Sequence, residues 1–579
     1  MKRLLQELKE YKAASIKAPL FMIGEVGLEL ALPVLMAYII DNGVMKGDMK
    51  TAVMMGAVML VTAFLSLGCG AMSAKCASYA SAGFVKNIRR AMFENIQRFS
   101  FHNIDRYSTA GLITRLMTDT TNVQNAYMMI LRMCVRAPMM LILAMVMTFS
   151  IHAQLAVYFL YALIFLGVAL TLITVLSYPI FQKVFRKYDD LNASVQENVT
   201  AIRVVKAYVR EEHEKQKFQK AASHLYRLFV KAESLLALNN PVMMLVVYTC
   251  ITFISWFGAQ YIVAGSMTTG EITSLLTYVM SIMMALMMLS MIFVMITMST
   301  ASVQRISEVL NEQPDLHDPQ QPLTEIENGS VDFDKVSFAY KKGSGENVLQ
   351  DINLHIHSGE TIGIIGGTGC GKSSLVNLIS RLYDVSEGTV RVGGKDVRSY
   401  DMEALRNNVA VVLQKNVLFS GTIYDNLRWG NETATDEECV AACKAACADE
   451  FIEQLPQKYD TWIERGGTNV SGGQKQRLCI ARALLKKPKI LILDDSTSAV
   501  DTATDAKIRK AFKEAIPGTT KIIIAQRVSS VEDADRIIVM DNGKINGIGS
   551  HEELMNTNEI YREIYESQKQ SGGDFDQAS

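Results

Sequence analysis

The segment 361–374, TIGIIGGTGCGKSS, has the residue types and the spacing of a phosphate-binding loop. It fits G-x-x-x-x-G-K-[ST] and lies between a strand-like run and a helical pattern, the context that this motif requires. The glycines let backbone amides close around phosphate at a helix N-terminus, the lysine neutralises phosphate oxygens, and the serine hydroxyl ligates magnesium. The sequence therefore predicts an ATP site with contacts from Gly366, Gly367, Thr368, Gly369, Cys370, Gly371, Lys372, Ser373 and Ser374.

A second candidate lies in residues 491–501, LILDDSTSAVD, where a hydrophobic strand-like run ends in two adjacent aspartates. Nucleotide hydrolases present a carboxylate to magnesium at such a strand end, which predicts this role for Asp494. Asp495 places a second carboxylate directly after it, and the role of this residue depends on what the rest of the chain is. The two segments together predict ATP and Mg²⁺ as cofactors.

The elements that must carry these residues fall into two halves. The chain has 579 residues, 49% hydrophobic and only 20% charged, which is too apolar for an ordinary soluble enzyme. Its net charge of −1 excludes the strong basic field of a nucleic-acid partner. Six apolar stretches in the first half are each long enough to cross a bilayer as a helix: residues 18–40, 53–74, 127–149, 154–178, 239–264 and 272–298.

The loops between these stretches predict the orientation. Segments 75–126 and 179–237 are long and rich in Lys and Arg, whereas the other connections are short and carry no excess of positive charge. By the positive-inside rule the two long segments are cytoplasmic, and so are both termini.

A proline-rich, acidic stretch at residues 313–323 marks a domain boundary, after which short strand-like runs alternate with helical ones. We expect a membrane domain at residues 1–310, a linker at 311–328 and an α/β nucleotide-binding domain at 329–579. The predicted fold class is an α-helical polytopic membrane domain followed by an α/β domain with a phosphate-binding loop.

The pentapeptide VSGGQ, residues 470–474, resembles the LSGGQ signature of ATP-binding cassette (ABC) transporters. It lies between the phosphate-binding loop and KILILDD, as in that family, and the resemblance extends over the whole chain. Six spans followed by one cassette look like a half-transporter with the type I exporter fold. Residues 101–120 and 197–214 resemble the two cytoplasmic loops that carry the family's coupling helices.

The resemblance implies further roles. Tyr340 looks like the aromatic residue that stacks on adenine, and Gln414 resembles the glutamine that reaches magnesium beside Ser373 and Asp494. Asp501 ends the segment SAVD and resembles a residue of the catalytic region.

In this family two cassettes enclose two ATP molecules. The resemblance implies that Ser471, Gly472, Gly473 and Gln474 complete an ATP site on another chain. Gln414 and Glu464 are expected to transmit cassette closure to segments near residues 107–118 and 200–209.

Two positions depart from the family pattern. Asp495 stands where hydrolytic cassettes usually carry glutamate, and Gln526 stands where they carry histidine. The carboxylate of aspartate is one methylene shorter than that of glutamate, so it holds the attacking water less well. Misplacement of a catalytic group by the length of a methylene costs about 100-fold in rate. Glutamine also cannot take a positive charge, so both departures predict tight binding of ATP with slow hydrolysis.

The chain therefore resembles the degenerate-site subunit of heterodimeric bacterial multidrug ABC exporters. This resemblance implies a second, different half-transporter as partner, apolar or amphipathic cargo, and a place in the bacterial cytoplasmic membrane. Three alternatives stay open on the sequence: a slow homodimeric exporter, a regulator or pore gated by ATP, and inward transport.

Three patterns in the sequence allow both a functional and a structural interpretation. Glu25 and Glu29 in the first span could attract cationic cargo, but pairing with Arg132 and Arg136 in the third span is the favoured prediction. A methionine stripe in the sixth span suits a drug cavity or ordinary helix packing, and its members are Met280, Met284, Met287, Met291, Met295 and Met298. The helical spacing of Cys439, Cys443 and Cys447 predicts a partly buried helix face rather than a metal site.

Overall fold

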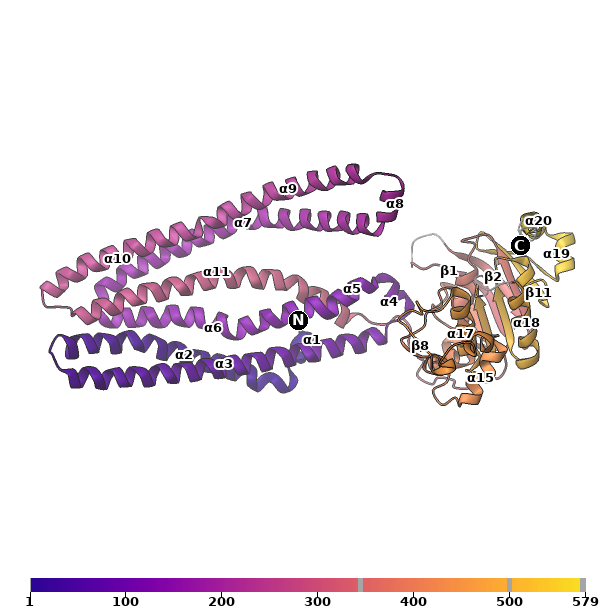
Figure 1. Ribbon diagram of the computed structural model, residues 1–579, viewed down its shortest axis with the longest axis horizontal. Helices are drawn as coiled ribbons and strands as arrows, with labels where there is room; N and C mark the ends of the chain where they lie inside the picture. Colours follow the sequence, from indigo (N-terminus) through magenta and orange to yellow (C-terminus); the bar gives the residue numbers. More distant parts are fainter. Residues whose placement is uncertain (1, 342–346, 497–501, 573–579) are drawn as a thin grey trace. The chain divides into compact units, whose positions relative to one another are not determined.

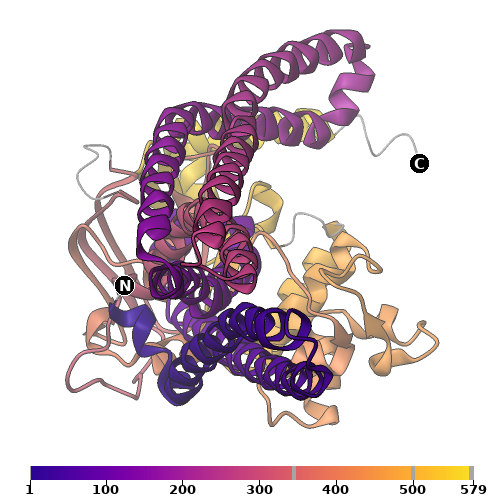
Figure 2. The same ribbon diagram turned by 90° about the vertical axis from the view of Figure 1, so that its left-hand side faces the viewer.

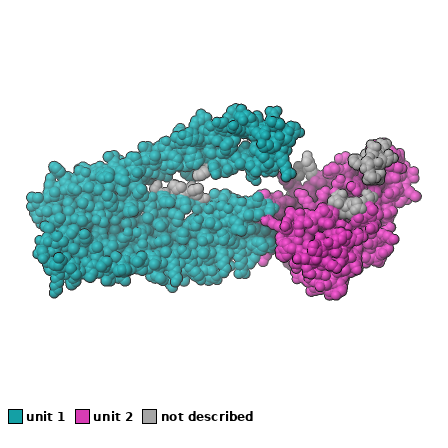
Figure 3. Space-filling view, viewed as in Figure 1, with its two compact units in different colours: residues 1–97, 109–312 teal, residues 98–108, 313–579 magenta. Residues whose placement is uncertain are grey.

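The computed structural model describes residues 2–341, 347–496 and 502–572. The chain forms two compact units, coloured separately in Figure 3. Unit 1 comprises residues 1–97 and 109–312, and unit 2 comprises residues 98–108 and 313–579. A short segment from the first half of the sequence therefore packs with the second unit.

Unit 1 is helical because its sequence consists of long apolar runs with few helix-breaking residues between the short loops. Its helices are α1 (Lys2–Gln6), α2 (Lys12–Tyr38), α3 (Met49–Gln97), α5 (Thr109–Thr114), α6 (Thr120–Ile151), α7 (Ala153–Thr200), α8 (Ile202–Ala207), α9 (Glu211–Ala237), α10 (Asn239–Val263) and α11 (Thr269–Asn311). Figures 1 and 2 show α2 beside α3 and α7 beside α9.

Within the described residues, six helical segments are long and apolar enough to cross a membrane: Lys9–Val44, Met49–Gln97, Thr109–Ile151, Ala153–Val184, Glu211–Val263 and Thr269–Leu289. Each of the six predicted spans lies within or largely within one of them. The helices α2, α6, α7, α10 and α11 share a buried apolar core. In that core the hydroxyl of fully buried Tyr278 donates a hydrogen bond to the Leu30 carbonyl at 2.7 Å.

Unit 2 contains a six-stranded sheet with the strand order β12-β11-β3-β10-β9-β6. Its strands are β3 (Thr361–Gly366), β6 (Val409–Val412), β9 (Ile490–Asp494), β10 (Thr520–Ile524), β11 (Arg536–Asp541) and β12 (Lys544–Gly549). The strands from β11 to β6 run parallel, and β12 pairs antiparallel with β11. All five residues of β9 and of β10 are buried, as expected for parallel strands covered on both faces.

A second, antiparallel sheet has the order β2-β1-β4-β5, and a small ribbon pairs β7 with β8. These strands are β1 (Val331–Phe338), β2 (Leu349–Ile356), β4 (Glu387–Val392), β5 (Lys395–Asp396), β7 (Gly421–Thr422) and β8 (Trp462–Ile463).

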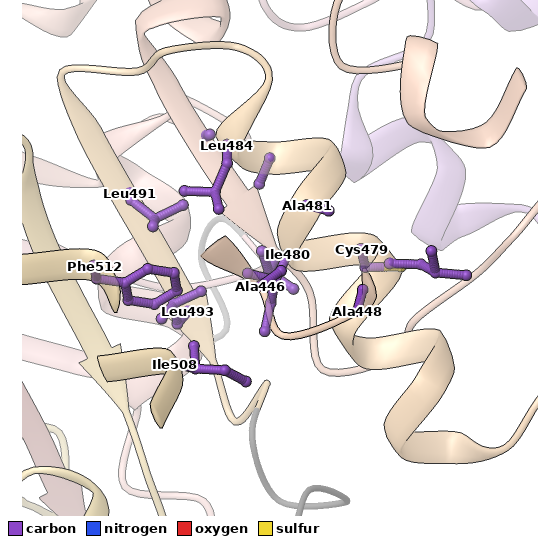
Figure 4. Close-up of a cluster of buried hydrophobic side chains, with 14 of the residues drawn as sticks. Ala446, Ala448, Cys479, Ile480, Ala481, Leu484, Leu491, Leu493, Ile508 and Phe512 are labelled. Carbon is purple, nitrogen blue, oxygen red and sulfur yellow. The ribbon is translucent and has the colours of Figure 1, made fainter. Parts of the chain in front are cut away.

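Unit 2 also contains helices. They are α4 (Phe101–Arg106), α12 (Lys372–Ile379), α13 (Met402–Asn408), α14 (Ile423–Arg428), α15 (Asp436–Ala445), α16 (Asp449–Ile452), α17 (Gly472–Leu484), α18 (Thr502–Ala515), α19 (His551–Thr557) and α20 (Glu559–Gly572). Figure 4 shows part of the core, in which Ile480 of α17 and Phe512 of α18 lie near Leu493 of β9. Burial of these side chains holds α17 and α18 against the strand that ends in Asp494, so the core positions the site.

Candidate active site

The phosphate-binding loop connects β3 to α12. Three glycines of the loop have positive φ angles, which residues with a Cβ rarely adopt: 154° at Gly366, 84° at Gly369 and 98° at Gly371. A Cβ on Gly366 would lie 2.2 Å from the Met540 carbonyl oxygen, so the loop can pass this strand only as glycine. Beside Gly367 and Gly369, by contrast, there is open space. The geometry is that of a backbone cradle for phosphate.

The lysine of the loop lies folded over the backbone. Lys372 Nζ donates hydrogen bonds to the carbonyl oxygens of Gly366 and Gly367, each at 2.8 Å. Its charge is therefore held at the mouth of the cradle, at the N-terminus of α12, where phosphate oxygens are favoured. Cys370 is buried under the loop, with Sγ 3.7 Å from the same ammonium group.

Two oxygen ligands suited to magnesium meet beside this cradle. Ser373 Oγ donates to Asp494 Oδ1 at 2.9 Å. Burial, together with the charge of neighbouring Asp495, raises the pKa of Asp494 above its ordinary value. The site thus concentrates negative charge that a hard divalent cation would compensate, and a hydroxyl and a carboxylate are donors that Mg²⁺ accepts. The residues present fit a magnesium ion, which when bound supplies charge neutralisation to phosphate oxygens.

Asp495 begins the segment after β9 with a φ angle of 49°. Its backbone N–H donates to the Ile524 carbonyl at 3.0 Å, which holds the residue against the end of β10. Its Oδ2 atom accepts two hydrogen bonds from side-chain amides, one from Gln526 Nε2 at 2.8 Å and one from Gln414 Nε2 at 3.3 Å. The structure therefore brings together both residues that depart from the family pattern.

The sheet order explains this convergence. The strands β3, β10, β9 and β6 are parallel neighbours, so their carboxyl ends lie along one edge of the sheet. The phosphate-binding loop follows β3, Gln526 follows β10, Asp494 and Asp495 close β9, and Gln414 follows β6. Four loops distant in sequence thereby form one site.

Tyr340, the predicted adenine-stacking residue, lies beyond the end of β1 and is 38% exposed. Its hydroxyl shares a hydrogen bond with Ser374 Oγ at 2.9 Å, which ties it to the first turn of α12. The residue is partly exposed, and its stacking on adenine stays a prediction.

The signature segment builds a helix N-terminus. Ser471 caps α17, and its hydroxyl accepts a bond from the Gln474 backbone N–H at 3.3 Å. The Gln474 side chain bonds back to the Ser471 N–H at 2.9 Å and completes a capping box. Gly472 and Gly473 form the first turn, which leaves the amides of a 13-residue helix uncrowded by side chains. Such a terminus attracts phosphate.

Other predicted residues lie apart from this site or outside the described chain. Asp501 lies outside the described residues. Glu464 Oε2 accepts a hydrogen bond from Thr468 Oγ1 at 2.9 Å within its own loop. The predicted cysteine helix face is confirmed for Cys439 and Cys443, which are buried in α15, whereas Cys447 is half-buried and lies beyond the end of this helix.

Two glutamines in the site were not predicted. Gln476 Nε2 donates to the Asp495 carbonyl oxygen at 3.3 Å. Gln568, in α20 near the end of the chain, donates to the Gln526 carbonyl oxygen at 2.7 Å and accepts from the Val528 N–H at 2.8 Å. Gln476 lies two residues after the signature and could have been noticed, but no local pattern marks Gln568 as a neighbour of Gln526.

Comparison with known proteins agrees with this geometry. Residues 16–287 match the family model described as ABC transporter transmembrane region, and residues 349–498 match the family model described as ABC transporter. The chain is 36% identical to the uncharacterized ABC transporter ATP-binding protein YfiB of Bacillus subtilis over 98% of both chains. The chain belongs to the ABC transporters.

Two other ABC proteins resemble this transporter over nearly its whole length. It is 31% identical to the ATP-dependent lipid A-core flippase of Desulfotalea psychrophila over 98% of this chain and 99% of the flippase. The solved structure of a bacterial Atm1-family ABC exporter with ATP bound matches with a TM-score of 0.82 and 25% identity, covering 96% of this chain and 99% of that one.

The transporter is thus an ABC exporter, a multi-pass membrane protein whose transmembrane domain is fused to an ATP-hydrolysing cassette that uses ATP and Mg²⁺. The predicted fold class is confirmed.

The membrane unit of the transporter pairs two half-buried carboxylates. Arg136 Nη1 lies 2.6 Å from Glu25 Oε1, and Arg136 Nη2 lies 2.7 Å from Glu29 Oε2. This confirms the predicted pairing for three of the four residues. Arg132 is different, because its buried Nε atom has no hydrogen-bond partner among the described residues. One guanidinium bridging two helical turns of α2 is a structural clamp between α2 and α6.

The methionine stripe lies on an uncovered face of α11. Met280, Met284, Met287 and Met291 are each more than 40% exposed, and the Met298 side chain lies outside the described residues. Exposed methionines fit a cavity lining, a lipid contact or a contact with a second chain equally well, so the drug-cavity interpretation stays a prediction.

Proposed function

We propose that this chain is one half of a heterodimeric exporter that moves hydrophobic or amphipathic compounds out across a bacterial cytoplasmic membrane. Its own ATP site binds ATP and hydrolyses it slowly, and its signature segment completes the competent site of a different half-transporter. The termini and the cassette face the cytoplasm, as the Lys- and Arg-rich segments predict.

The observation that carries the proposal is the environment of Asp495. Its Oδ2 atom accepts bonds from the side-chain amides of Gln526 and Gln414. These donors occupy an oxygen that would otherwise accept a proton from an attacking water, which weakens Asp495 as a general base. Gln526 is also neutral at every pH, so it adds no positive charge where negative charge develops on phosphate.

The signature side supports the partner assignment. The capping box of Ser471 and Gln474 holds the N-terminus of α17 in the form that attracts phosphate, and neither glycine is replaced. A chain whose own site has lost two catalytic features but whose signature is intact is expected to serve an ATP molecule on another chain.

The cargo class is supported by relatives. The flippase of Desulfotalea psychrophila is named for a lipid, and a relative from Bacillus subtilis, 30% identical over 98% of both chains, is named a putative multidrug export protein. Arg136 bonds both Glu25 and Glu29, so its single positive charge offsets one of their two negative charges. The names of the relatives therefore carry the assignment to apolar or amphipathic compounds.

The test is steady-state MgATP turnover of the purified chain in lipid nanodiscs, with bound nucleotide measured on the same sample. We expect full occupancy of the site by nucleotide with very slow MgATP turnover. Turnover should increase greatly when a half-transporter encoded by an adjacent gene is added. Fast turnover by the chain alone would make a homodimer the correct assembly. Stimulated turnover without flux of a lipophilic dye in vesicles would indicate a regulator.

A signature variant tests the trans site in the two-chain assembly. Ser471→Ala removes the hydroxyl that caps α17, and we expect turnover of the assembly to fall about tenfold. Ser550→Ala is the matched control, because Ser550 caps α19 with the same capping box, formed with Glu553, in the same cassette. An equal loss of turnover in both variants would show that Ser471→Ala acts through the stability of the fold and not through the trans site.

A further inference from the structure

Tyr383, just after α12, joins two parts of unit 2 that no sequence motif connects. Its ring packs edge-on against Tyr340, with centroids 5.1 Å apart and an interplanar angle of 89°. Its hydroxyl donates to Asp105 Oδ2 of α4 at 2.6 Å, and Phe101 of α4 lies edge-on at 6.1 Å. One side chain thus contacts both the predicted adenine-binding aromatic residue and a helix of the first cytoplasmic loop.

The nucleotide side of this arrangement is fixed in orientation. Phe338 of β1 packs against Tyr340 at 4.9 Å and against Tyr383 at 5.7 Å, so the three rings form one cluster. Edge-to-face packing restricts the orientation of each ring, so a displacement of one ring should displace the ring packed against it. Tyr340 is in turn bonded to Ser374, at the end of the phosphate-binding loop.

The other side is also fixed. Ser100 caps α4 and bonds to Asp315, and buried Asn103 donates from Nδ2 to the Gln313 carbonyl at 3.1 Å. These two bonds hold the start of α4 to the segment that follows α11, whereas Asp105 near its end is held by Tyr383. A shift of Tyr383 would therefore tilt α4 about a fixed end.

The hydrogen bond between Tyr383 and Asp105 joins a neutral donor to a carboxylate acceptor. Burial, and then the hydrogen bond to the Asp105 carboxylate, raise the pKa of the Tyr383 phenol, in keeping with a hydroxyl that donates to this carboxylate. Hydrogen bonds to an ionised acceptor are shorter and about twice as strong as neutral ones.

We propose that Tyr383 is a positioning residue that couples binding of the adenine ring at Tyr340 to the position of α4, through its hydrogen bond to Asp105. This route is separate from the one through Gln414 and Glu464 that the family resemblance implies. The coupling requires nucleotide binding at this chain's own site, but it does not require hydrolysis there. The proposal therefore holds whether hydrolysis at that site is slow or fast.

The test measures hydrogen–deuterium exchange of the full-length chain in nanodiscs, with and without Mg²⁺ and the non-hydrolysable analogue AMP-PNP. The readout is the nucleotide-dependent change in exchange of residues 98–108, with residues 366–374 reporting binding. We expect AMP-PNP to slow exchange of both segments in the wild type. In Tyr383→Phe, which keeps the ring and removes the hydroxyl, the effect on residues 98–108 should fall about tenfold while residues 366–374 respond normally.

A double-mutant cycle and a matched control complete the test. Asp105→Ala should reproduce the loss, and the double variant should lose no more than either single one, because both remove the same bond. Asp105 is exposed, so this variant carries the test if Tyr383→Phe does not fold. Tyr459→Phe removes another tyrosine–aspartate bond, to Asp449 at 2.7 Å, and should leave residues 98–108 responsive.

Three results would overturn the proposal. They are an unresponsive α4 in the wild type, a full response in Tyr383→Phe, and an equal loss in Tyr459→Phe. None of these results depends on ATP turnover, so a failure of the slow-hydrolysis proposal would leave them unchanged.

Discussion

Glu25 with Glu29 in the membrane unit and Asp494 with Asp495 in the cassette are both pairs of neighbouring carboxylates, and their surroundings differ. In the membrane unit Glu25 and Glu29 lie within hydrogen-bond distance of the two terminal nitrogens of Arg136. In the cassette Asp494 accepts from the Ser373 hydroxyl, and Asp495 accepts from two amide groups.

The difference separates a structural pair from a binding pair. A guanidinium within the same chain bonds both membrane carboxylates, so each has a charged partner without a ligand. In the cassette the pKa of Asp494 is raised, which means that the charged form is held at a cost in the nucleotide-free protein. Magnesium would remove that cost, so the cassette pair is the one suited to binding a cation.

The largest expected effect comes from restoring the family residues around the cassette pair. We expect the double variant Asp495→Glu with Gln526→His to raise MgATP turnover of the chain alone about 100-fold, because the longer carboxylate and a chargeable imidazole return to the phosphate. The measurement is steady-state phosphate release in nanodiscs. Asp495→Glu alone should recover part of the increase, and no increase in the double variant would contradict the assigned cause of slow hydrolysis.

The membrane pair predicts the next largest effect. Arg136→Met leaves two carboxylates without their cation, and we expect the loss of two charged hydrogen bonds to destabilise the folded protein by about 2 kcal/mol. The measurement is the yield of monodisperse protein after detergent extraction. Arg132→Met is the matched control from the same helix, and it should change the yield little. Equal losses in both variants would contradict the clamp between α2 and α6.

The smallest expected effect is a change in the thermal midpoint on replacing Asp494, which should have opposite signs without and with MgATP. Because its pKa is raised in the folded state, this group contributes most to stability below its unfolded pKa near 3.8, and the contribution is lost as the pH rises through the folded pKa. Asp494→Asn should therefore raise the thermal midpoint of the nucleotide-free cassette at pH 7, and the gain should shrink toward pH 4. With MgATP the order should reverse, because the variant loses a magnesium ligand.

Asp396 provides the opposite control for that measurement. Burial acts to raise its pKa, but hydrogen bonds from Arg398 outweigh burial and lower it. Stability from this group is present above the unfolded pKa and lost as the pH falls. Asp396→Asn should accordingly lower the thermal midpoint at pH 7. A midpoint that moves the same way in both variants would show that charge compensation does not control either site.

Local patterns predicted a large share of this architecture. Six apolar runs long enough to span a bilayer predicted the helices of unit 1, since in lipid a continuous apolar run has few alternatives to a helix. The phosphate-binding loop was predicted because its glycines, lysine and serine act together over a few residues. For the same reason the signature segment appears in the structure as a capped helix, with Ser471 and Gln474 three residues apart.

What the sequence determined by itself was the identity of the reacting groups: a phosphate cradle, two aspartates, and a glutamine in place of histidine. Only the tertiary structure decided which groups meet. Strand order depends on long-range pairing energies, and the order β3-β10-β9-β6 brings Gln414 and Gln526 to one oxygen of Asp495. The choice of Arg136 over Arg132 depends on how α6 is rotated against α2. The contact of Tyr383 with Asp105 joins residues 278 positions apart, which no local pattern can encode.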